Sequence, residues 1–432
     1  MATDVDVQYF SHLNGLVLDN NWGDMIRLLD ACLVNGVKLP SVTSASIDEQ
    51  GDVHLTLFSP HKATLLQVVE LTDFEPVSLN QKYRIKGVPS DSQIILKPQS
   101  ALTETIIAKK GVSKLASLGY DIVFRDVNDV KRVYRAKNPT AQHPYIRVDE
   151  SLASPDGSSG VYNSTYAKFA MVGLLEHMDH IDDFNNSDVL QLPFDTSDPV
   201  KNWKITGTSS GVVRGWNRWY WRKRGGSSPG EQYSDADTAI PSGNGQFTLA
   251  GSADAFYLIT SIHQNRLGRK IMMGCGLFDS TTSSEVIPNW FLGGAITTSS
   301  AGNFYSTIYN SQNMTMLASG VTSGKFLVPR NNILSRLSAH EYANCSVTGY
   351  GSGLLDSHPK SNIAATDFPF SDDDGYLRGS LKHVCFSRKN HVYGITTPLL
   401  EDTSMYVYEN AYNSAVAADI LGGFYFYLGE LS

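Results

Sequence analysis

The sequence predicts a mainly β protein with an N-terminal helix, a small β-barrel-like domain and a larger β-sandwich-like body. Three observations favour this fold class. Only 18% of the 432 residues are charged, below the roughly 25% that is usual for globular chains. Glycine and tyrosine are abundant, with 36 and 21 copies, which is typical of strands joined by many turns. Apolar and polar residues alternate over short runs bounded by turn residues, which is the period of half-buried strands.

The first part of the chain, residues 1–37, is expected to hold an extended arm followed by a helix. Residues 1–21 are predicted as the arm. Across residues 22–34, apolar side chains recur at the i, i+3, i+4, i+7 spacing of one helix face. Gly36 follows at the position where a glycine commonly ends a helix. We therefore predict one short amphipathic helix near the start of the chain.

Residues 38–110 are predicted to form the small β-barrel-like domain. In VHLTL at residues 53–57 apolar residues alternate with polar ones, which is typical of antiparallel strands with one wet face. A helix over residues 103–118 competes with a strand at its start, and Gly111 counts against that helix because glycine costs about 1 kcal/mol relative to alanine. Further strands are predicted at residues 42–47, 64–71 and 103–108 and around Tyr83, Ile85, Ile94 and Leu96.

The larger body is expected to span residues 111–432. Its first segment, residues 119–150, is predicted to be two strands joined through a turn at Asn138 and Pro139, because proline fixes φ and keeps its predecessor out of the helical region. Residues 151–246 are predicted as an inserted irregular region, with a strand or short helix at residues 166–177. Later strands are predicted at residues 247–250, 255–262, 271–278, 326–328, 383–386, 405–408 and 424–428.

The most distinctive local feature is a run rich in tryptophan and arginine at residues 214–224, and two interpretations of it are open. It can be an aromatic and cationic surface that contacts another subunit or a polyanion, because tryptophan and arginine dominate interface hot spots. It can equally be a twisted strand with tryptophan on the core face and arginine on the wet face. The candidate contact residues are Trp216, Arg218, Trp219, Trp221 and Arg222, together with Tyr425 and Tyr427 of the C-terminal aromatic strand.

No motif for catalysis or metal binding stands out. Glu176, His177 and His180 form an EHxxH pattern, one residue short of the HExxH spacing that places two histidines on one helix face. A solvated polar segment is the preferred interpretation. The acidic run at residues 372–375 lacks the spacing of a calcium loop and is predicted to be a turn. We expect no catalytic residue, no metal site and no cofactor.

Composition limits the partners and the compartment. The net charge of −8 and the isoelectric point near 5.8 argue against general nucleic-acid binding, which needs a basic surface. No apolar run approaches the roughly 18 residues of a transmembrane segment, and the N-terminus lacks the pattern of a secretory signal. The four cysteines are far apart and are expected to be reduced thiols, with one disulfide as the alternative. The low charged fraction suggests a surface partly covered by other subunits.

Several segments follow one another in an order that resembles a family of virion structural proteins of tailed bacteriophages. They are LLDACLVNG at residues 28–36, VTSASIDEQGDVHLTLFSPH at 42–61, VVELTDF at 68–74, LNQKYRIKGVPSDSQIIL at 79–96, GYDIVFRDVNDVKRVYRAKNP at 119–139 and DGYLRGSLKHVCFSRKNHVYG at 374–394. The small domain is similar to a β module that such proteins share with ubiquitin-activating enzymes. Two departures are the excess of Trp and Arg in the run above and the lack of the glycine usual near His61.

The resemblance implies a mechanical function rather than a catalytic one, and no catalytic residue carries over from the family. It implies a tail or head-to-tail collar protein, one concrete form being a non-contractile sheath around a short tail. Such a protein is made in the host cytoplasm, joins the virion, forms a ring with copies of itself and contacts other tail, portal or adaptor proteins. A receptor-binding protein of the tail that contacts the host envelope is the alternative, and a glycan-degrading enzyme is a third class.

Overall fold

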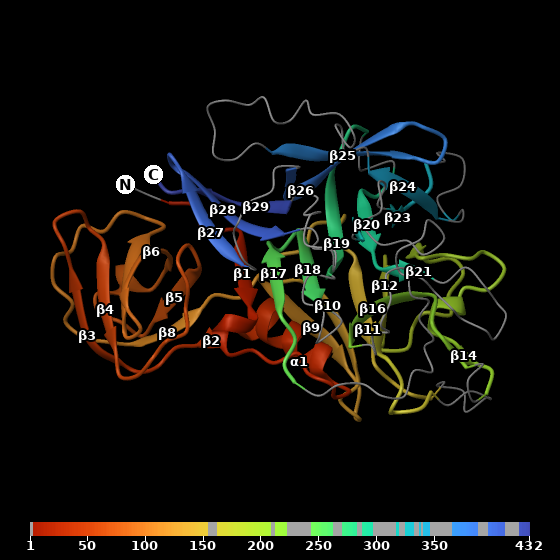
Figure 1. Ribbon diagram of the computed structural model, residues 1–432, viewed down its shortest axis with the longest axis horizontal. Coiled ribbons are helices and arrows are strands. Elements are labelled where there is room, and N and C mark those ends of the chain that lie inside the picture. The colour runs from red at the N-terminus through yellow and green to blue at the C-terminus, as the bar shows by residue number, and fades with distance from the viewer. Residues whose placement is uncertain are drawn as a thin grey trace, which may run out of the picture.

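The computed structural model describes residues 3–153, 162–208, 212–222, 243–261, 270–282, 287–296, 317–318, 325–331, 337, 340–345, 365–387, 396–410 and 423–432. In these residues the protein is mainly β with one short helix near the N-terminus, so the predicted fold class is confirmed. Figure 1 shows a small domain beside a larger body, with both chain ends near the boundary between them. No helix in the described part is long and apolar enough to cross a membrane.

The N-terminal region forms a strand as well as the predicted helix. β1 (Gln8–Ser11) pairs antiparallel with β17 of the body, so the predicted arm is in part a strand of the large sheet. After the turn η1 (His12–Asn14), the helix runs as α1 (Asp24–Leu29) and continues as the π-helical η2 (Asp30–Asn35). The chain leaves the helix at Gly36, whose φ of 73° is unfavourable for residues with a side chain.

The small domain is one antiparallel sheet that curls into a half-barrel. The strand order is β2–β8–β5–β6–β7–β4–β3. In β4 the first, third and fifth side chains are buried and the two between them are half-buried, as the alternation predicted. The strands are β2 (Val37–Lys38), β3 (Val42–Ile47), β4 (Val53–Leu57), β5 (Val68–Thr72), β6 (Lys82–Ser90), β7 (Gln93–Pro98) and β8 (Val112–Leu115), with the turn η3 (Val77–Leu79) after β5.

One predicted strand of the small domain is absent. Residues 103–108 form no strand, and the amide of Ala108 instead donates to the carbonyl of Glu75. The competing helix over residues 103–118 is also wrong, because β8 occupies part of that range. Gly111 gives the physical reason: a Cβ there would lie 2.0 Å from the carbonyl oxygen of Thr72, so the chain passes its neighbour too closely for a helix.

A second sheet begins with the strand pair predicted in residues 119–150. β10 and β11 pair antiparallel, with Tyr134 opposite Ile146, and β9 is a third strand in the same segment. The order is β21–β16–β12–β11–β10–β9, and β13 pairs with β12. Its strands are β9 (Tyr120–Arg125), β10 (Lys131–Ala136), β11 (Tyr145–Asp149), β12 (Lys168–Leu175), β13 (Gln191–Leu192), β16 (Asn217–Arg222) and β21 (Ala295–Ile296).

The predicted irregular insertion at residues 151–246 is wrong in its described parts. This region supplies β12 and β16, two central strands of the second sheet, and the small pair β14 (Ile205–Thr206) and β15 (Val213–Arg214). It also holds the turn η4 (Lys201–Trp203). The strand alternative at residues 166–177 is confirmed by β12, and the strand interpretation of the tryptophan-rich run is confirmed by β16. Neither strand shows alternation, because every residue of both is buried.

The largest sheet contains a closed barrel. β19 pairs with β20 and also with β26, so the path β19–β20–β23–β24–β25–β26 returns to its first strand. β1, β17 and β18 extend this sheet on one side, and β29, β28 and β27 on the other. The strands are β17 (Phe247–Gly251), β18 (Ala255–Ser261), β19 (Lys270–Ser280), β20 (Trp290–Gly293), β22 (Leu317–Ala318), β23 (Lys325–Val328), β24 (Glu341–Cys345), β25 (Thr366–Asp372), β26 (Leu377–Ser387), β27 (Thr397–Glu401), β28 (Ser404–Asn410) and β29 (Gly423–Glu430).

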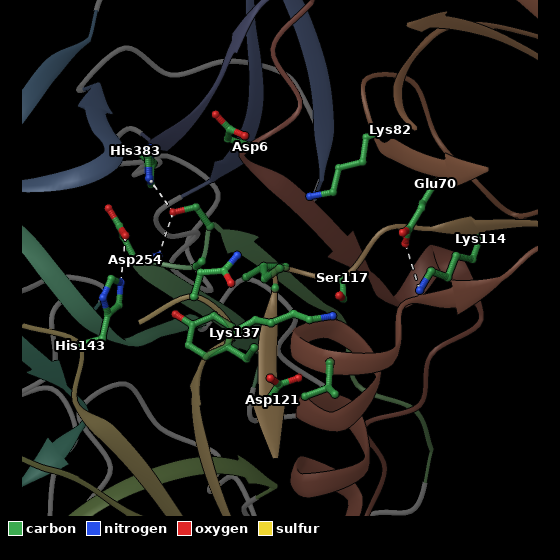
Figure 2. Close-up of a pocket in the computed structure, with 17 residues that line it drawn as sticks. Asp6, Glu70, Lys82, Lys114, Ser117, Asp121, Lys137, His143, Asp254 and His383 are labelled. Atoms are coloured by element: carbon green, nitrogen blue, oxygen red, sulfur yellow. Dashed lines mark hydrogen bonds and ion pairs between the residues drawn. The ribbon is translucent and has the colours of Figure 1, made fainter. Parts of the chain in front are cut away.

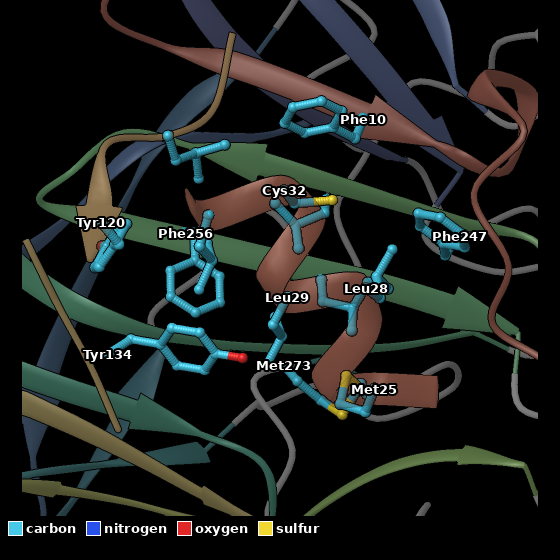
Figure 3. Close-up of a cluster of buried hydrophobic side chains, with 14 of the residues drawn as sticks. Phe10, Met25, Leu28, Leu29, Cys32, Tyr120, Tyr134, Phe247, Phe256 and Met273 are labelled. Carbon is cyan, nitrogen blue, oxygen red and sulfur yellow. The ribbon is translucent and has the colours of Figure 1, made fainter. Parts of the chain in front are cut away.

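The helix is packed between the sheets, which gives the body its sandwich-like form. Figure 3 shows Met25, Leu28 and Leu29 of α1 facing aromatic residues of both sheets, among them Tyr134 and Phe256. One apolar cluster runs from the small domain through the helix into the body, and a second fills the closed barrel. The domain boundaries at residues 37 and 110 stay predictions.

The cysteines are free where the structure describes them. Cys32 and Cys275 are buried and Cys385 is half-buried, and all three are free thiols. Burial raises the pKa of each of these thiols, so none of them is activated as a thiolate. The side chain of Cys345 lies outside the described part of the structure.

Candidate functional site

The tryptophan-rich run forms a central strand rather than an exposed surface. β16 lies between β12 and β21, and its six side chains are all buried. Trp219 and Trp221 are fully buried, and their indole N–H groups donate to the carbonyls of Gly293 and Asp19. Trp216, just before the strand, is 8% exposed and lies edge-on to a histidine ring. Residues 223 and 224 of the run lie outside the described residues.

The arginines of the run that the structure describes are buried too, so the interpretation that these arginines face water is wrong. Arg214 donates three hydrogen bonds to main-chain carbonyl groups, and burial lowers its pKa to about 10. The guanidinium of Arg218 donates to the Gly215 carbonyl and lies 4.8 Å from the centre of the Phe169 ring. Arg222 donates to the Gly243 carbonyl. Carbonyl partners replace water around these cations, which offsets part of the cost of burying them.

The C-terminal candidates lie in the barrel sheet. Tyr425 and Tyr427 belong to β29, between β26 and β28; the first is buried and the second is half-buried. The hydroxyl of Tyr427 donates to the carboxylate of Glu430, 2.5 Å away. Six of the seven candidate contact residues are thus buried and Tyr427 is half-buried, and they lie in or beside two different sheets. A ring contact through some other surface stays a prediction.

The two histidines of the EHxxH pattern have different partners and do not share a site. His177 bonds to Asp179, and His180 bonds to the amide of Asp182. The Asp182 carboxylate accepts hydrogen bonds from Lys131 and Arg147. No group of three or more possible metal ligands occurs among the residues that the structure describes. The acidic run at residues 372–375 is a turn, as predicted, since the Gly375 amide donates to the Asp372 carbonyl.

A cleft between the small domain and the body is the best candidate for a binding site. Its volume is about 570 Å³, within the range of about 300–1,000 Å³ that is usual for ligand sites. Figure 2 shows side chains reaching it from both sides. Glu70, Lys82 and Lys114 come from the small domain, residues 117–121 from the connection to the body, Asp6 from the N-terminal segment, and Lys137, Asn138, His143, Ser252, Ala253, Asp254 and His383 from the body.

The wall on the body side is held by a histidine that is hydrogen-bonded at both ring nitrogens. His143 accepts a hydrogen bond from the Thr140 amide at Nδ1, which leaves Nε2 protonated to donate to Asp254 at 3.0 Å. Lys382 also donates to Asp254, at 2.6 Å. The hydrogen bond from His143 and the nearby lysine hold the pKa of Asp254 well below its usual range. This network ties the turn between β10 and β11 to the turn between β17 and β18.

A serine and a histidine meet in the same wall, but they do not complete a catalytic triad. The hydroxyl of Ser252 lies 3.0 Å from Nε2 of His383. Burial, and next the neighbouring Lys382, lower the pKa of His383, so its ring is neutral and accepts this hydrogen bond. In the described residues no carboxylate bonds to the other ring nitrogen, which is the group that orients the base in hydrolases. The pair therefore serves best as a hydrogen-bonding surface.

Charged groups of both signs face the cleft, and some of them are paired while others are not. Glu70 and Lys114 form an ion pair at 3.0 Å. Lys82 and Lys137, and likewise Asp6 and Asp121, make no ion pair within the described part of the chain. Two ammonium groups and two carboxylates around one cavity suit a ligand with many donors and acceptors, such as a polyhydroxylated molecule.

Sequence reasoning missed this cleft because its residues come from eight separate segments of the chain. His143 lies within residues 119–150, the segment that carries the clearest family resemblance, but there it is one polar residue of a turn. The polar turns at residues 137–143 and 252–254 were the only sequence signal. Nothing in either turn indicates that the other lies beside it.

Comparisons with known proteins add little to this description. No family model matches the chain, and no curated protein matches it. Among solved structures it is similar to a phage phi92 endosialidase, with 8% sequence identity and a TM-score of 0.14. The match covers 92% of this chain, which spans about half of the endosialidase (51%). A TM-score this low carries no argument about fold or function.

Proposed function

We propose that the protein is a structural subunit of a tailed-phage virion that assembles as a ring in the tail or in the collar between head and tail. A non-contractile sheath around a short tail is the most specific form of this proposal. It is supported by the order of the sequence segments described above. The observation that carries it is the exposure of large apolar side chains at both ends of the small domain, since such patches mark contacts with other chains.

The first end lies beside the turn between β5 and β6. Val77 in η3 is 77% exposed, and Ile106 is 75% exposed. The two belong to neighbouring segments, because the amide of Ala108 donates to the carbonyl of Glu75. The two exposed side chains therefore lie at the same end of the small domain, where they can form one apolar patch.

The second end lies at the tip of the β6–β7 hairpin. Phe58, directly after β4, is 80% exposed, and Val88 of β6 is 38% exposed. The amide of Leu57 donates to the Ser92 carbonyl, which places Phe58 beside this hairpin tip. The two ends are therefore separated by the length of β6. Two different patches on one molecule are what a head-to-tail ring requires, because each copy presents one patch to each neighbour.

Assembly can be tested with the purified chain. We expect rings by negative-stain electron microscopy and a concentration-dependent mass by light scattering, and we expect antibodies to this chain to label tails or collars of virions. Val77→Asp with Ile106→Asp, or Phe58→Asp alone, should abolish the rings while leaving the monomer folded. Val127→Asp is the matched control, because Val127 is fully exposed on the β9–β10 turn of the body.

Two results would contradict the proposal. One is a monomer at every concentration together with virions that bear no antibody label. The other is loss of rings in the Val127→Asp control to the same degree as in the small-domain variants. Since some virion proteins assemble only on a template, the labelling experiment decides when the isolated chain stays monomeric.

A receptor-binding protein of the tail is the second candidate, and the polar cleft favours it. Unpaired lysines and carboxylates around a cavity of about 570 Å³ are compatible with binding a host glycan. A pull-down with host envelope fractions separates the two functions, because a ring component that does no more than assemble binds only virion proteins. Our proposal includes no catalytic step, and release of oligosaccharides from host polysaccharide by the pure protein would overturn that part of it.

A further inference from the structure

Two chain connections between the small domain and the body run side by side. One leaves the helix through Gly36 into β2, and the other leaves β8 through residues 116–119. β2 pairs with β8, and the amides of Leu118 and Gly119 donate to the carbonyls of Cys32 and Leu33 at the end of the helix. Both crossings lie at one place, which is the arrangement that a hinge between two parts requires.

The N-terminal segment, residues 3–11, makes a third connection. Its β1 is a strand of the body sheet, while the side chain of Gln8 is bound to the small domain. The Gln8 amide donates to the carbonyls of Val68 and Ala116, and its oxygen accepts the Val68 amide hydrogen. Val5 packs with Val68 and Ala116 in a small apolar cluster. The segment therefore holds β5 against the body.

Arg84 fixes this arrangement from the small domain. Its side chain in β6 is fully buried, and all of its bonds go to main-chain carbonyls. It donates twice to Asp4 and once to Val7 in the N-terminal segment, once to Leu66 beside β5, and once to Leu428 in β29. These are the five N–H donors of a guanidinium, so one side chain joins three parts of the chain with none left over.

The C-terminal strand completes the connection. The amide of Asp4 donates to the Glu430 carbonyl, and the amide of Glu430 donates to the Asp4 carboxylate. The Thr3 hydroxyl also donates to the Glu430 carbonyl. The beginning of the described chain is thus bound to β29 of the body and to Arg84 of the small domain at once.

We propose that residues 3–11 are a strap that locks the hinge, so that its release lets the small domain swing relative to the body while both stay folded. Of the five bonds of Arg84, the three to Asp4 and Val7 depend on the strap. The candidate cleft lies between the hinge and the strap, since residues 117–121 and Asp6 both line it. The strap therefore sets the width of the cleft. This inference does not depend on the proposed ring function.

Hydrogen exchange measured on the full chain and on Arg84→Met tests the strap. Methionine fills a similar volume but donates no hydrogen bond. We expect amides bound across the junction, such as those of Val68 and Glu430, to exchange at least about tenfold faster. Amides inside each part, in the β4–β7 and β11–β12 pairs, should change less than about twofold. Small-angle X-ray scattering should show a larger radius of gyration.

Arg214→Met is the matched control, because Arg214 is equally buried and bound to carbonyls but lies within the body. It should not accelerate exchange at Val68. If Arg84→Met does not fold, deletion of residues 1–6 removes the Asp4 contacts and leaves β1 in place. Unchanged exchange at the junction in either variant, or acceleration of all amides together, would overturn the proposal.

Discussion

The small domain and the second sheet bury their strands in different ways. In β4 every second side chain is buried, whereas all eight residues of β12 and all six of β16 are buried. The small domain is a half-barrel with an outer face in water, while β12 and β16 are central strands covered on both faces. Alternation therefore reports a strand only where one face is wet. The contrast also predicts where polar substitutions are tolerated.

The largest expected effect is on a buried residue of the second sheet. Val133 of β10 is fully buried in a cluster with Met171 and Trp203. Val133→Asp would place a carboxylate there without a partner and should cost roughly 4 kcal/mol or more, enough to unfold the body. Val123→Asp on the neighbouring β9 is the control, because Val123 is 39% exposed. Circular dichroism during urea unfolding measures both, and a soluble, folded Val133→Asp variant would show that this sheet is peripheral.

Trp219→Ala tests whether the tryptophan-rich run is core or contact surface. Its side chain is fully buried and bonded to the Gly293 carbonyl, so truncation should lower the free energy of unfolding of the monomer by about 3–5 kcal/mol. Trp219→Phe should lose less, since it keeps most of the apolar volume. Equilibrium unfolding at a concentration where no assembly occurs gives the answer. Unchanged monomer stability combined with failed assembly would favour the contact interpretation instead.

The buried carboxyl group of Glu150 should make the stability of the body depend on pH. Its buried carboxylate accepts the amide hydrogens of Gly23 and Ile26 at the start of α1. Burial raises its pKa to about 7, and the amide bonds offset only part of that shift. Because the folded state holds this proton more tightly than the unfolded state, the stabilisation is complete below about pH 4.5 and is lost as the pH rises through 7. Its size is on the order of 3 kcal/mol.

Glu150→Gln should flatten this dependence. The glutamine amide keeps an oxygen that accepts the hydrogen bonds from the helix, but it cannot titrate. The free energy of unfolding of the variant should therefore fall less between pH 5 and 8 than that of the unchanged chain. Denaturant unfolding at a series of pH values measures the free energy of unfolding of both proteins. The difference between the two values at each pH removes the contributions of other titrating groups. Parallel pH profiles for the two would show that Glu150 does not titrate in this range.

The smallest expected effect is on the wet face of the small domain. Thr56 lies on β4 between two buried leucines, and its own side chain points to the half-exposed face. Thr56→Lys should change the free energy of unfolding by less than about 0.5 kcal/mol. Denaturant unfolding of the variant and of the unchanged chain measures this difference. A loss of several kcal/mol would mean that the half-barrel is covered on its outside, which would remove the contrast with the second sheet.

Much of the fold could be predicted from local pattern. The helix appeared in the expected range because its apolar period is visible in one stretch, and the β4, β6 and β7 strands appeared because they alternate. The predictions for residues 103–118 were wrong because the close approach of Gly111 to Thr72 decided the conformation there. Within residues 151–246, β12 and β16 were predicted only as one of two alternatives each, and pairing with β11 and β21 decided for the strand.

The candidate site could not be predicted in this way. Trp219, Arg218 and their neighbours attracted attention because large aromatic and cationic side chains are common at interfaces, but the fold gave them carbonyl partners and covered them. The cleft residues Lys82, Lys137 and His383 are ordinary in sequence. They became a candidate site only because eight segments of the chain meet there.

The sequence by itself determined the local elements: a β-rich chain, one short helix, and turns where proline, glycine and aspartate demand them. The tertiary structure alone decided which polar residues are buried and what they hold together. Arg84 shows the reason. Burying a guanidinium costs less when its donors find acceptors, and the acceptors of Arg84 lie at Asp4, Val7, Leu66 and Leu428, up to 344 residues away. No local pattern can reveal contacts at that separation.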